Sequence, residues 1–221
     1  MLELINISKR YKDKWVLKDI HMKLNEERCV GILGVNGSGK TTLLSILAGV
    51  LKPNSGKVMY SDADLLKNQT LRRKLIAYIP QKSPLIEELN ALDNLKLWYD
   101  KEELKKKISS GVISLLGVDE FLKKPVSALS MGMKKRLSIA CAVASKPKIL
   151  LMDEPSAYLD IICKADIHRY ISEHKRQGGS IILVSHDVGD FTVCDEHYVL
   201  KSGVLSPFEY KDNVDELIKK L

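Results

Sequence analysis

The chain has 221 residues, of which 45% are hydrophobic and 29% are charged, and its formal net charge is +7. This length and apolar content favour one folded domain with a sizeable core and exclude a disordered chain. The longest apolar run, Ile139–Ala144, is far shorter than the ~18–20 residues needed to cross a bilayer. The first residues lack a basic start followed by an apolar stretch, so we expect no signal peptide.

The four cysteines are scattered and form no Cys-x-x-Cys pair. This spacing argues against a disulfide framework or a zinc site and predicts a reducing, cytosolic location. The positive charge suits nucleic acid, an anionic membrane surface or an anionic ligand, and composition does not choose among them.

Five segments before the end of the chain are predicted to be strands. Residues 4–8 and 15–24 alternate apolar and polar side chains, which is typical of strands with one solvent-facing side. Three later runs, Cys29–Leu33, Ile149–Met152 and Ile181–Val184, are apolar at every position. Such runs indicate central strands of a parallel sheet that is covered on both faces. Each run ends in polar or glycine-rich residues, where an open α/β sheet usually places its chemistry.

Residues 90–145 have a different composition, rich in Leu, Lys, Glu and Ala. They predict a mostly helical lobe inserted between two strands of the sheet. Near the end of the chain, Tyr198–Leu200, a turn at Ser202-Gly203 and Val204-Leu205 predict a hairpin. A last short helix is expected at residues 212–221.

A glycine-rich loop, Gly34–Thr42, follows the first apolar run and precedes an amphipathic stretch. Glycines let successive backbone N–H groups point at one anion, and the start of the next helix adds its positive end. Lys40 would reach the β- and γ-phosphates of a nucleotide, and the Thr41 hydroxyl would hold Mg²⁺. The other expected binding residues are Asn36, Gly37, Ser38, Gly39 and Thr42. The loop alone indicates nucleotide binding, which GTPases, kinases and motors share.

Two carboxylates, Asp153 and Glu154, follow the second apolar run. Asp153 fits the Mg²⁺ position that accompanies a phosphate loop. Glu154, one residue further on, would orient and deprotonate a water molecule. The alternative is a pair of solvated loop carboxylates, and the neighbouring phosphate loop weighs against it.

The stretch Leu129–Leu137, Leu-Ser-Met-Gly-Met-Lys-Lys-Arg-Leu, resembles the signature motif of ABC-type ATPases, whose usual form is Leu-Ser-Gly-Gly-Gln. The other motifs follow the family's order across nearly the whole chain. Tyr11 is placed like the adenine-stacking aromatic, and Gln81 like the glutamine of the Q-loop. Asp160 ends a segment similar to the D-loop, and His186 matches the switch histidine.

This resemblance implies a single ABC-type P-loop ATPase domain over residues 1–221. A RecA-like α/β lobe with a mixed sheet would span about residues 1–81 and 147–221, and an α-helical lobe about residues 82–146. Two copies would dimerise head to tail around two ATP molecules, with Ser130 and Gly132 touching the ATP of the other copy. The implied catalytic residues are Glu154, His186 and Gln81, and the implied Mg²⁺ ligands are Thr41, Gln81 and Asp153. Tyr11 and Asp160 join the nucleotide-binding set.

The resemblance also implies a function, the ATP-hydrolysing subunit of a membrane transporter. The form Ser-x-Gly-Met-Lys-x-Arg-Leu and the segment Asp93–Tyr99 look like those of the drug, antibiotic and polysaccharide export class, so we expect an exporter. A separate integral membrane subunit would be the partner, on the cytoplasmic face of the cell membrane, and no nucleic acid is expected. A non-transport ABC ATPase, such as an iron–sulfur assembly partner, is the alternative. A weakly hydrolysing regulator is a third, because Met131 and Met133 replace the usual glycine and glutamine.

Three further features accompany the resemblance. Tyr158 stands where the D-loop usually has glycine. Residues 101–146 carry ten basic and four acidic side chains, so the excess charge belongs to the helical segment. We expect a solvated face there, or closeness of Lys134–Arg136 to ATP phosphates and of the lobe to the membrane surface. Five apolar residues would either belong to the core or form a groove for a partner's helix. They are Leu85, Ile86, Leu89, Trp98 and Tyr99.

Overall fold

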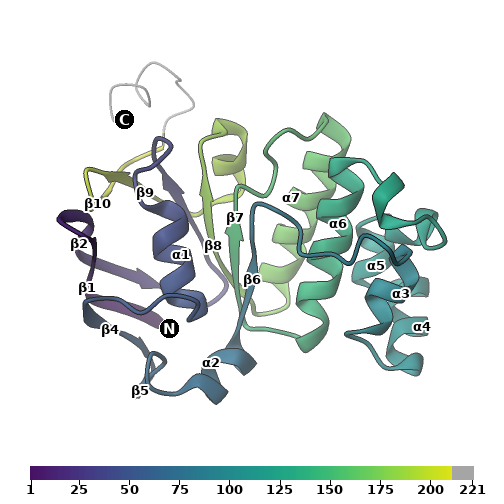
Figure 1. The fold of residues 1–221 in the computed structure, drawn as a ribbon, viewed down its shortest axis with the longest axis horizontal. Coiled ribbons are helices and arrows are strands. Elements are labelled where there is room, and N and C mark those ends of the chain that lie inside the picture. Colours follow the sequence, from purple (N-terminus) through teal and green to yellow (C-terminus); the bar gives the residue numbers. More distant parts are fainter. Residues whose placement is uncertain (211–221) are drawn as a thin grey trace.

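The computed structural model describes residues 1–210 (Figure 1), so the helix expected at residues 212–221 lies outside the described part. A six-stranded sheet has the order β10-β9-β3-β8-β7-β6. Strands β9, β3, β8, β7 and β6 are parallel to one another, and β10 pairs antiparallel with β9. The bounds are β3 Cys29–Leu33, β6 Ile76–Ile79, β7 Ile149–Asp153, β8 Ser180–Ser185, β9 Glu196–Lys201 and β10 Val204–Pro207. The predicted mixed sheet and the hairpin at its edge are therefore present.

A second, antiparallel sheet has the order β2-β1-β4-β5. Its strands are β1 Leu2–Tyr11, β2 Lys14–Leu24, β4 Ser55–Tyr60 and β5 Ala63–Asp64. The alternating pattern predicted β1 and β2, whereas the separate sheet that they build with β4 and β5 was not predicted. Helix α1, Lys40–Ala48, lies between the two sheets (Figure 1) and shares one hydrophobic cluster with both. Helix α2, Gln69–Leu75, leads into β6.

The mixed sheet is covered on both faces, as the continuous apolar runs predict. Along β7, Ile149 and Leu151 pack into the cluster that contains α1, whereas Leu150 and Met152 pack into a second cluster that contains the other helices. The alternation follows from the two-residue period of a strand. Each such side chain, when fully buried, contributes about 1.5–3 kcal/mol of hydrophobic free energy.

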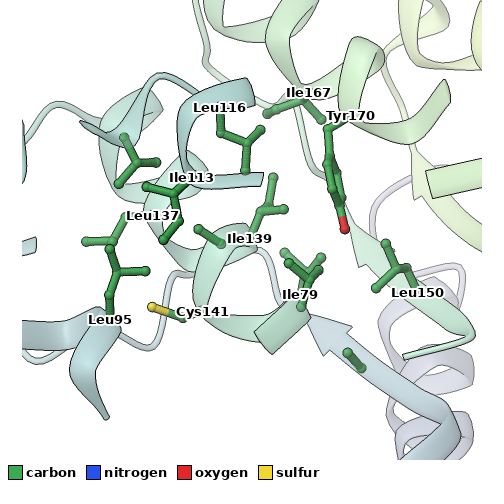
Figure 2. Packing of buried hydrophobic residues seen from close by; sticks show 14 of the residues in the cluster. Ile79, Leu95, Ile113, Leu116, Leu137, Ile139, Cys141, Leu150, Ile167 and Tyr170 are labelled. Carbon is green, nitrogen blue, oxygen red and sulfur yellow. The ribbon is translucent and has the colours of Figure 1, made fainter. Parts of the chain in front are cut away.

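The second cluster joins the sheet to the helices on its other side. Figure 2 shows Leu95, Ile113, Leu137 and Ile139 packed in the same core as Tyr170 and Leu150. The helices and 3-10 turns after β6 are α3 Ala91–Lys96, α4 Lys101–Ser110, α5 Val112–Leu115, η1 Val118–Phe121, η2 Val126–Ala128, α6 Met131–Ala142, η3 Val143–Ser145, α7 Ile161–Arg176 and η4 Val188–Val193. Helices α3 to α6 fall between β6 and β7, but they share a core with the sheet. The lobe boundaries near residues 82 and 146 therefore remain a proposal.

The apolar set named above divides between core and surface. Tyr99 is buried, and its hydroxyl donates to the carbonyl oxygen of Ala140 at 2.6 Å. Trp98 and Ile86, in contrast, are 63% and 43% exposed. Within residues 1–210, none of the helices has both the length and the apolar character needed to span a membrane.

The carboxyl ends of four parallel strands meet at one edge of the mixed sheet. Leu33 at the end of β3 pairs with Ser185 at the end of β8. On the other side of β8, Asp153 pairs with Val184, and Ile79 of β6 pairs with Met152 of β7. The segments that follow these strands are thereby brought together, and they carry the predicted site residues.

Candidate functional site

The phosphate loop connects the end of β3 to the start of α1. Gly37 and Gly39 have φ angles of 79° and 110°, a left-handed region that favours glycine. Gly39 precedes α1 directly, and no side chain caps that helix. The first backbone N–H groups of α1 therefore have no competing side-chain acceptor, as an anion site would require.

A cavity of about 280 Å³ opens in front of this loop. It brings together residues from four distant parts of the chain. Its lining consists of Tyr11, Val16, residues 35–42, Gln81 and Glu154. The predicted aromatic, phosphate loop, Q-loop glutamine and general base therefore surround one space.

Lys40 is held at the buried side of this cavity, with 6% of its surface exposed. Its ammonium donates to the carbonyl oxygens of Gly34 at 2.6 Å and Val35 at 3.4 Å. The same Nζ lies 3.5 Å from Oε1 of Glu154. The loop's own carbonyls thus fix the position of the cation.

Asp153 is nearly completely buried, with 1% of its surface exposed. The hydroxyl of Tyr78 donates to its Oδ2 at 3.1 Å, whereas its Oδ1 has no hydrogen-bond partner among the described residues. Burial raises the pKa of Asp153, and the hydroxyls of Thr41 and Tyr78 partly oppose this shift. A buried acceptor atom without a partner is a site that a cation or its bound water would satisfy.

Glu154 is fixed by the segment that follows β8. Its backbone is left-handed, with φ of 48°, and its N–H donates to the carbonyl oxygen of Val184 at 2.9 Å. Its Oε2 lies 2.7 Å from Nδ1 of His186 and accepts the backbone N–H of His186 at 3.2 Å. His186 therefore holds the carboxylate through both its ring and its backbone N–H.

A buried polar network continues behind this pair, and the sequence did not predict it. The hydroxyl of Ser185 lies 2.7 Å from Oδ2 of Asp190 and 3.4 Å from Oε2 of Glu154. Since a hydroxyl has one proton, the shorter contact identifies Asp190 as its main acceptor. Asp190 is itself 1% exposed, and its Oδ1 lies 3.0 Å from Nε2 of His168 on α7. No local pattern in the sequence pointed to this network, because His168 comes from α7 and Asp190 from the turn after β8.

The signature residues lie at the start of α6. Ser130 caps this helix, and its Oγ accepts the N–H of Met133 at 3.2 Å. Gly132 is buried against α7, where a Cβ atom would lie 2.5 Å from Sγ of Cys163. Asp160 caps α7 by accepting the N–H of Cys163 at 2.8 Å, an interaction that lowers the pKa of Asp160.

These signature and D-loop residues do not line the cavity of their own chain. The lining contains Gln81 and Glu154, but not Ser130, Gly132 or Asp160. The cavity thus brings together ten of the fifteen predicted site residues, namely Tyr11, residues 36–42, Gln81 and Glu154. Asp153 and His186 do not line it, but Asp153 is next to Glu154 in the chain and His186 contacts the Glu154 carboxylate.

The three consecutive basic residues of α6 are each paired within the chain. Lys134 lies 2.9 Å from Glu87, and Arg136 lies 3.1 Å from Asp166. Lys135 is buried and donates to the carbonyl oxygens of Pro80 and Gln81. Burial lowers the pKa of Lys135 to about 8. Each of these positive charges is thus balanced or hydrogen-bonded within the chain, and the predicted closeness of Lys134–Arg136 to ATP phosphates stays a prediction.

Comparisons with known proteins agree with this geometry. The chain matches the family described as ABC transporter over residues 17–157. It is 35% identical over 209 residues to the spermidine/putrescine import ATP-binding protein PotA of Mesoplasma florum, covering 92% of this chain and 59% of that protein. The chain thus spans about three-fifths of the length of such relatives. It is 28% identical over 226 residues to the lipopolysaccharide export system ATP-binding protein LptB of Haemophilus influenzae, covering 98% of this chain and 94% of that protein.

A solved structure gives the same result for the fold. The dimeric structure of a post-hydrolysis state of the ATP-binding cassette MJ0796, bound to ADP and Pi, matches with a TM-score of 0.84 and 26% identity. The match covers 96% of this chain and 100% of that one. The family match extends over more than half of the chain and includes the phosphate loop, the signature stretch and the acid pair. The chain therefore belongs to the ABC transporter ATP-binding family and has the α/β fold of an ABC-type P-loop ATPase.

Proposed function

We propose that this chain binds and hydrolyses ATP to power a membrane transporter, and that the transporter is an exporter. The observation that carries the proposal is the single cavity lined by the phosphate loop, Gln81 and Glu154. Tyr11 lines the same cavity and is 44% exposed, and the ammonium of Lys9 lies 5.3 Å from the centre of its ring, so an adenine would stack on the other face. Stacking of a base on an aromatic side chain contributes about 1–3 kcal/mol.

The side chains around the cavity support a hydrolytic mechanism. Glu154 is the general base, and its carboxylate is oriented toward the cavity by His186. Lys40 places a positive charge beside the phosphate loop, where it stabilises the charge of the β- and γ-phosphates. Gln81 lines the same cavity and would orient the attacking water or a metal ligand.

The same residues fit a Mg²⁺ ion. Asp153 presents a buried carboxylate oxygen without a partner among the described residues, and the Thr41 hydroxyl is close enough to influence its pKa. Hydroxyl, carboxylate and amide oxygens are the hard ligands that Mg²⁺ prefers. When bound, the ion would neutralise charge on the phosphates. We assign it to Thr41, Gln81 and Asp153.

A head-to-tail dimer accounts for the residues outside the cavity. Ser130 is exposed at the start of α6, a 12-residue helix whose positive end suits a phosphate. We infer that Ser130 and Gly132 meet the ATP held by a second copy. The description of MJ0796 as a dimer bound to ADP and Pi supports this arrangement. ATP would then hold two copies together, and hydrolysis would release them.

The transport assignment rests on the family and on the surface. The relatives include an import protein and an export protein, so they support transport without fixing its direction. Export is supported by the Ser-x-Gly-Met-Lys-x-Arg-Leu form of residues 130–137. Trp98 and Ile86, which are exposed next to the helical core, are the proposed contacts for a membrane subunit at the cytoplasmic face.

Affinity purification from detergent-solubilised membranes tests the transport assignment. A hydrophobic membrane protein that copurifies in stoichiometric amounts supports it, whereas a water-soluble scaffold protein would favour the non-transport alternative. Direction is then measured in inside-out vesicles containing both subunits and a labelled cell extract. ATP-dependent accumulation inside the vesicles is expected for an exporter, and vesicles carrying Glu154→Gln are the matched control. ATP-dependent loss from preloaded vesicles would contradict export.

A further inference from the structure

Lys135 makes a buried connection between the signature helix and the Q-loop. It lies on α6, five residues after Ser130, and 4% of its surface is exposed. Its ammonium donates to the carbonyl oxygen of Pro80 at 2.9 Å and to that of Gln81 at 3.1 Å. Two successive carbonyls of the segment that leaves β6 are therefore held by one side chain of α6.

The surroundings explain how a cation is tolerated there. Burying an ammonium is costly unless hydrogen bonds and opposite charges replace its water. The two carbonyls provide the hydrogen bonds, and the carboxylates of Asp153, Glu154 and Asp190 provide favourable electrostatics. The positive charge of Lys135 thus belongs to the same electrostatic cluster as the acid pair.

The neighbouring basic residues have different partners. Lys134 pairs with Glu87 near the surface, and Arg136 donates to Asp166 and to the carbonyl oxygen of Leu116. Arg136 therefore ties α6 to α7 and to the end of α5, whereas Lys135 ties α6 to the backbone of the Q-loop. The two side chains are both largely buried, which makes them a matched pair for an experiment.

We infer that Lys135 is a positioning residue for hydrolysis, which acts by fixing the backbone of Gln81 against the first turns of α6. This inference rests on the proposed function, in which Gln81 works at its own chain's cavity and Ser130 meets the ATP of a second copy. Because Ser130 caps the helix that carries Lys135, a shift of the signature end of α6 moves the carbonyls of Pro80 and Gln81 that Lys135 holds. Engagement of one ATP is thereby transmitted to the Q-loop that serves the other.

A double-mutant cycle between Lys135 and Gln81 tests the inference. In the full chain, Lys135→Met removes the charge and both hydrogen bonds while keeping the length of the side chain. We expect kcat for ATP hydrolysis to fall about 10- to 100-fold, as for other residues that orient a catalytic group, with KM for ATP little changed. In a Gln81→Ala background the same substitution should cause no further loss. Lys135→Arg, which keeps the charge and the donors, should recover most of the activity.

Arg136→Met is the matched control, since it also removes a buried cation of α6 that bonds a backbone carbonyl. Its effect on kcat should multiply with that of Gln81→Ala. If Lys135→Met also multiplies with Gln81→Ala, or if Arg136→Met shows the same non-additivity, the positioning role is wrong. If Gln81→Ala leaves hydrolysis of the otherwise unchanged chain intact, the proposed function of Gln81 fails instead.

Hydrogen exchange gives a second measurement that does not depend on hydrolysis. In Lys135→Gln, peptides that cover residues 80–86 should exchange faster, while peptides of α7 keep their protection. Arg136→Met should give the reverse pattern. Unchanged exchange at residues 80–86 in folded Lys135→Gln would overturn the inference, and this variant also replaces Lys135→Met in the cycle if the latter does not fold.

Discussion

Replacing Gly132 by alanine should destabilise the chain through contact with α7. A Cβ atom at this position would lie 2.5 Å from Sγ of Cys163 and 3.2 Å from its Cβ. Since nonbonded heavy atoms pack at about 3.5–4.0 Å, one of the two helices must shift by about 1 Å. Overpacking of this kind costs about 1–3 kcal/mol, and the better helix propensity of alanine returns up to about 1 kcal/mol. We therefore expect a net loss of about 1–2 kcal/mol in the free energy of unfolding.

Urea unfolding and ATP hydrolysis of a double variant check this reasoning. Cys163→Ala removes the sulfur, so Gly132→Ala combined with Cys163→Ala should be more stable than the two single effects predict, with a coupling of about 1–2 kcal/mol. Hydrolysis lost in Gly132→Ala should return in the double variant, because the backbone N–H groups at the start of α6 are restored to their place. Effects that add to within about 0.5 kcal/mol would refute the packing argument. A stable double variant without hydrolysis would show that the glycine is needed at the phosphate itself.

Three further predictions follow from other residues. Burial lowers the pKa of His174 to about 4, so between pH 6.5 and 4 the unfolded chain binds more protons than the folded one, and stability falls as pH falls. Lowering the pH from 7 to 5 should therefore reduce the free energy of unfolding by about 2 kcal/mol. Urea unfolding should show this loss in the unchanged chain but not in His174→Phe. An equal loss in the variant would contradict the assignment. Tyr158 has a left-handed backbone with φ of 62°, which costs a non-glycine residue about 1–2 kcal/mol. Thermal unfolding should therefore find Tyr158→Gly at least as stable as the unchanged chain and Tyr158→Val about 1 kcal/mol less stable, and the opposite order would disprove the strain. Asp153→Asn should abolish Mg²⁺-dependent hydrolysis, whereas titration with a fluorescent ATP analogue should still show binding without Mg²⁺. If Mg²⁺ stimulates hydrolysis as much in this variant as in the unchanged chain, Asp153 is not a metal ligand.

The strands that are buried on both faces could be predicted from the sequence. Cys29–Leu33 and the runs that became β7 and β8 are apolar at every position because both faces of the sheet are covered. Helix α7 was not predicted, although Cys163, Ile167 and Ile171 follow a helical spacing and are buried. Its first two residues, Ile161 and Ile162, are 82% and 71% exposed, and they obscure the amphipathic pattern.

The candidate site was predictable where its residues are next to one another in sequence. The phosphate loop, the acid pair and the switch histidine each follow a buried strand, so strand ends predict their meeting. The roles of Lys135 and His168 depend on contacts between separate segments of the chain, Lys135 with Gln81 and His168 with Asp190. No local pattern encodes those contacts, and the burial of a lysine is against its usual behaviour.

The most direct test of ATP-driven closure is the mass of the Glu154→Gln variant in solution. Glu154 is the proposed base, so the variant should bind ATP without turning it over and keep two copies together. Sedimentation velocity should show a dimer with ATP and Mg²⁺ and a monomer with ADP. The further substitution Ser130→Arg, at the exposed start of α6, should restore the monomer with ATP. A Glu154→Gln chain that binds ATP and stays monomeric would contradict the account.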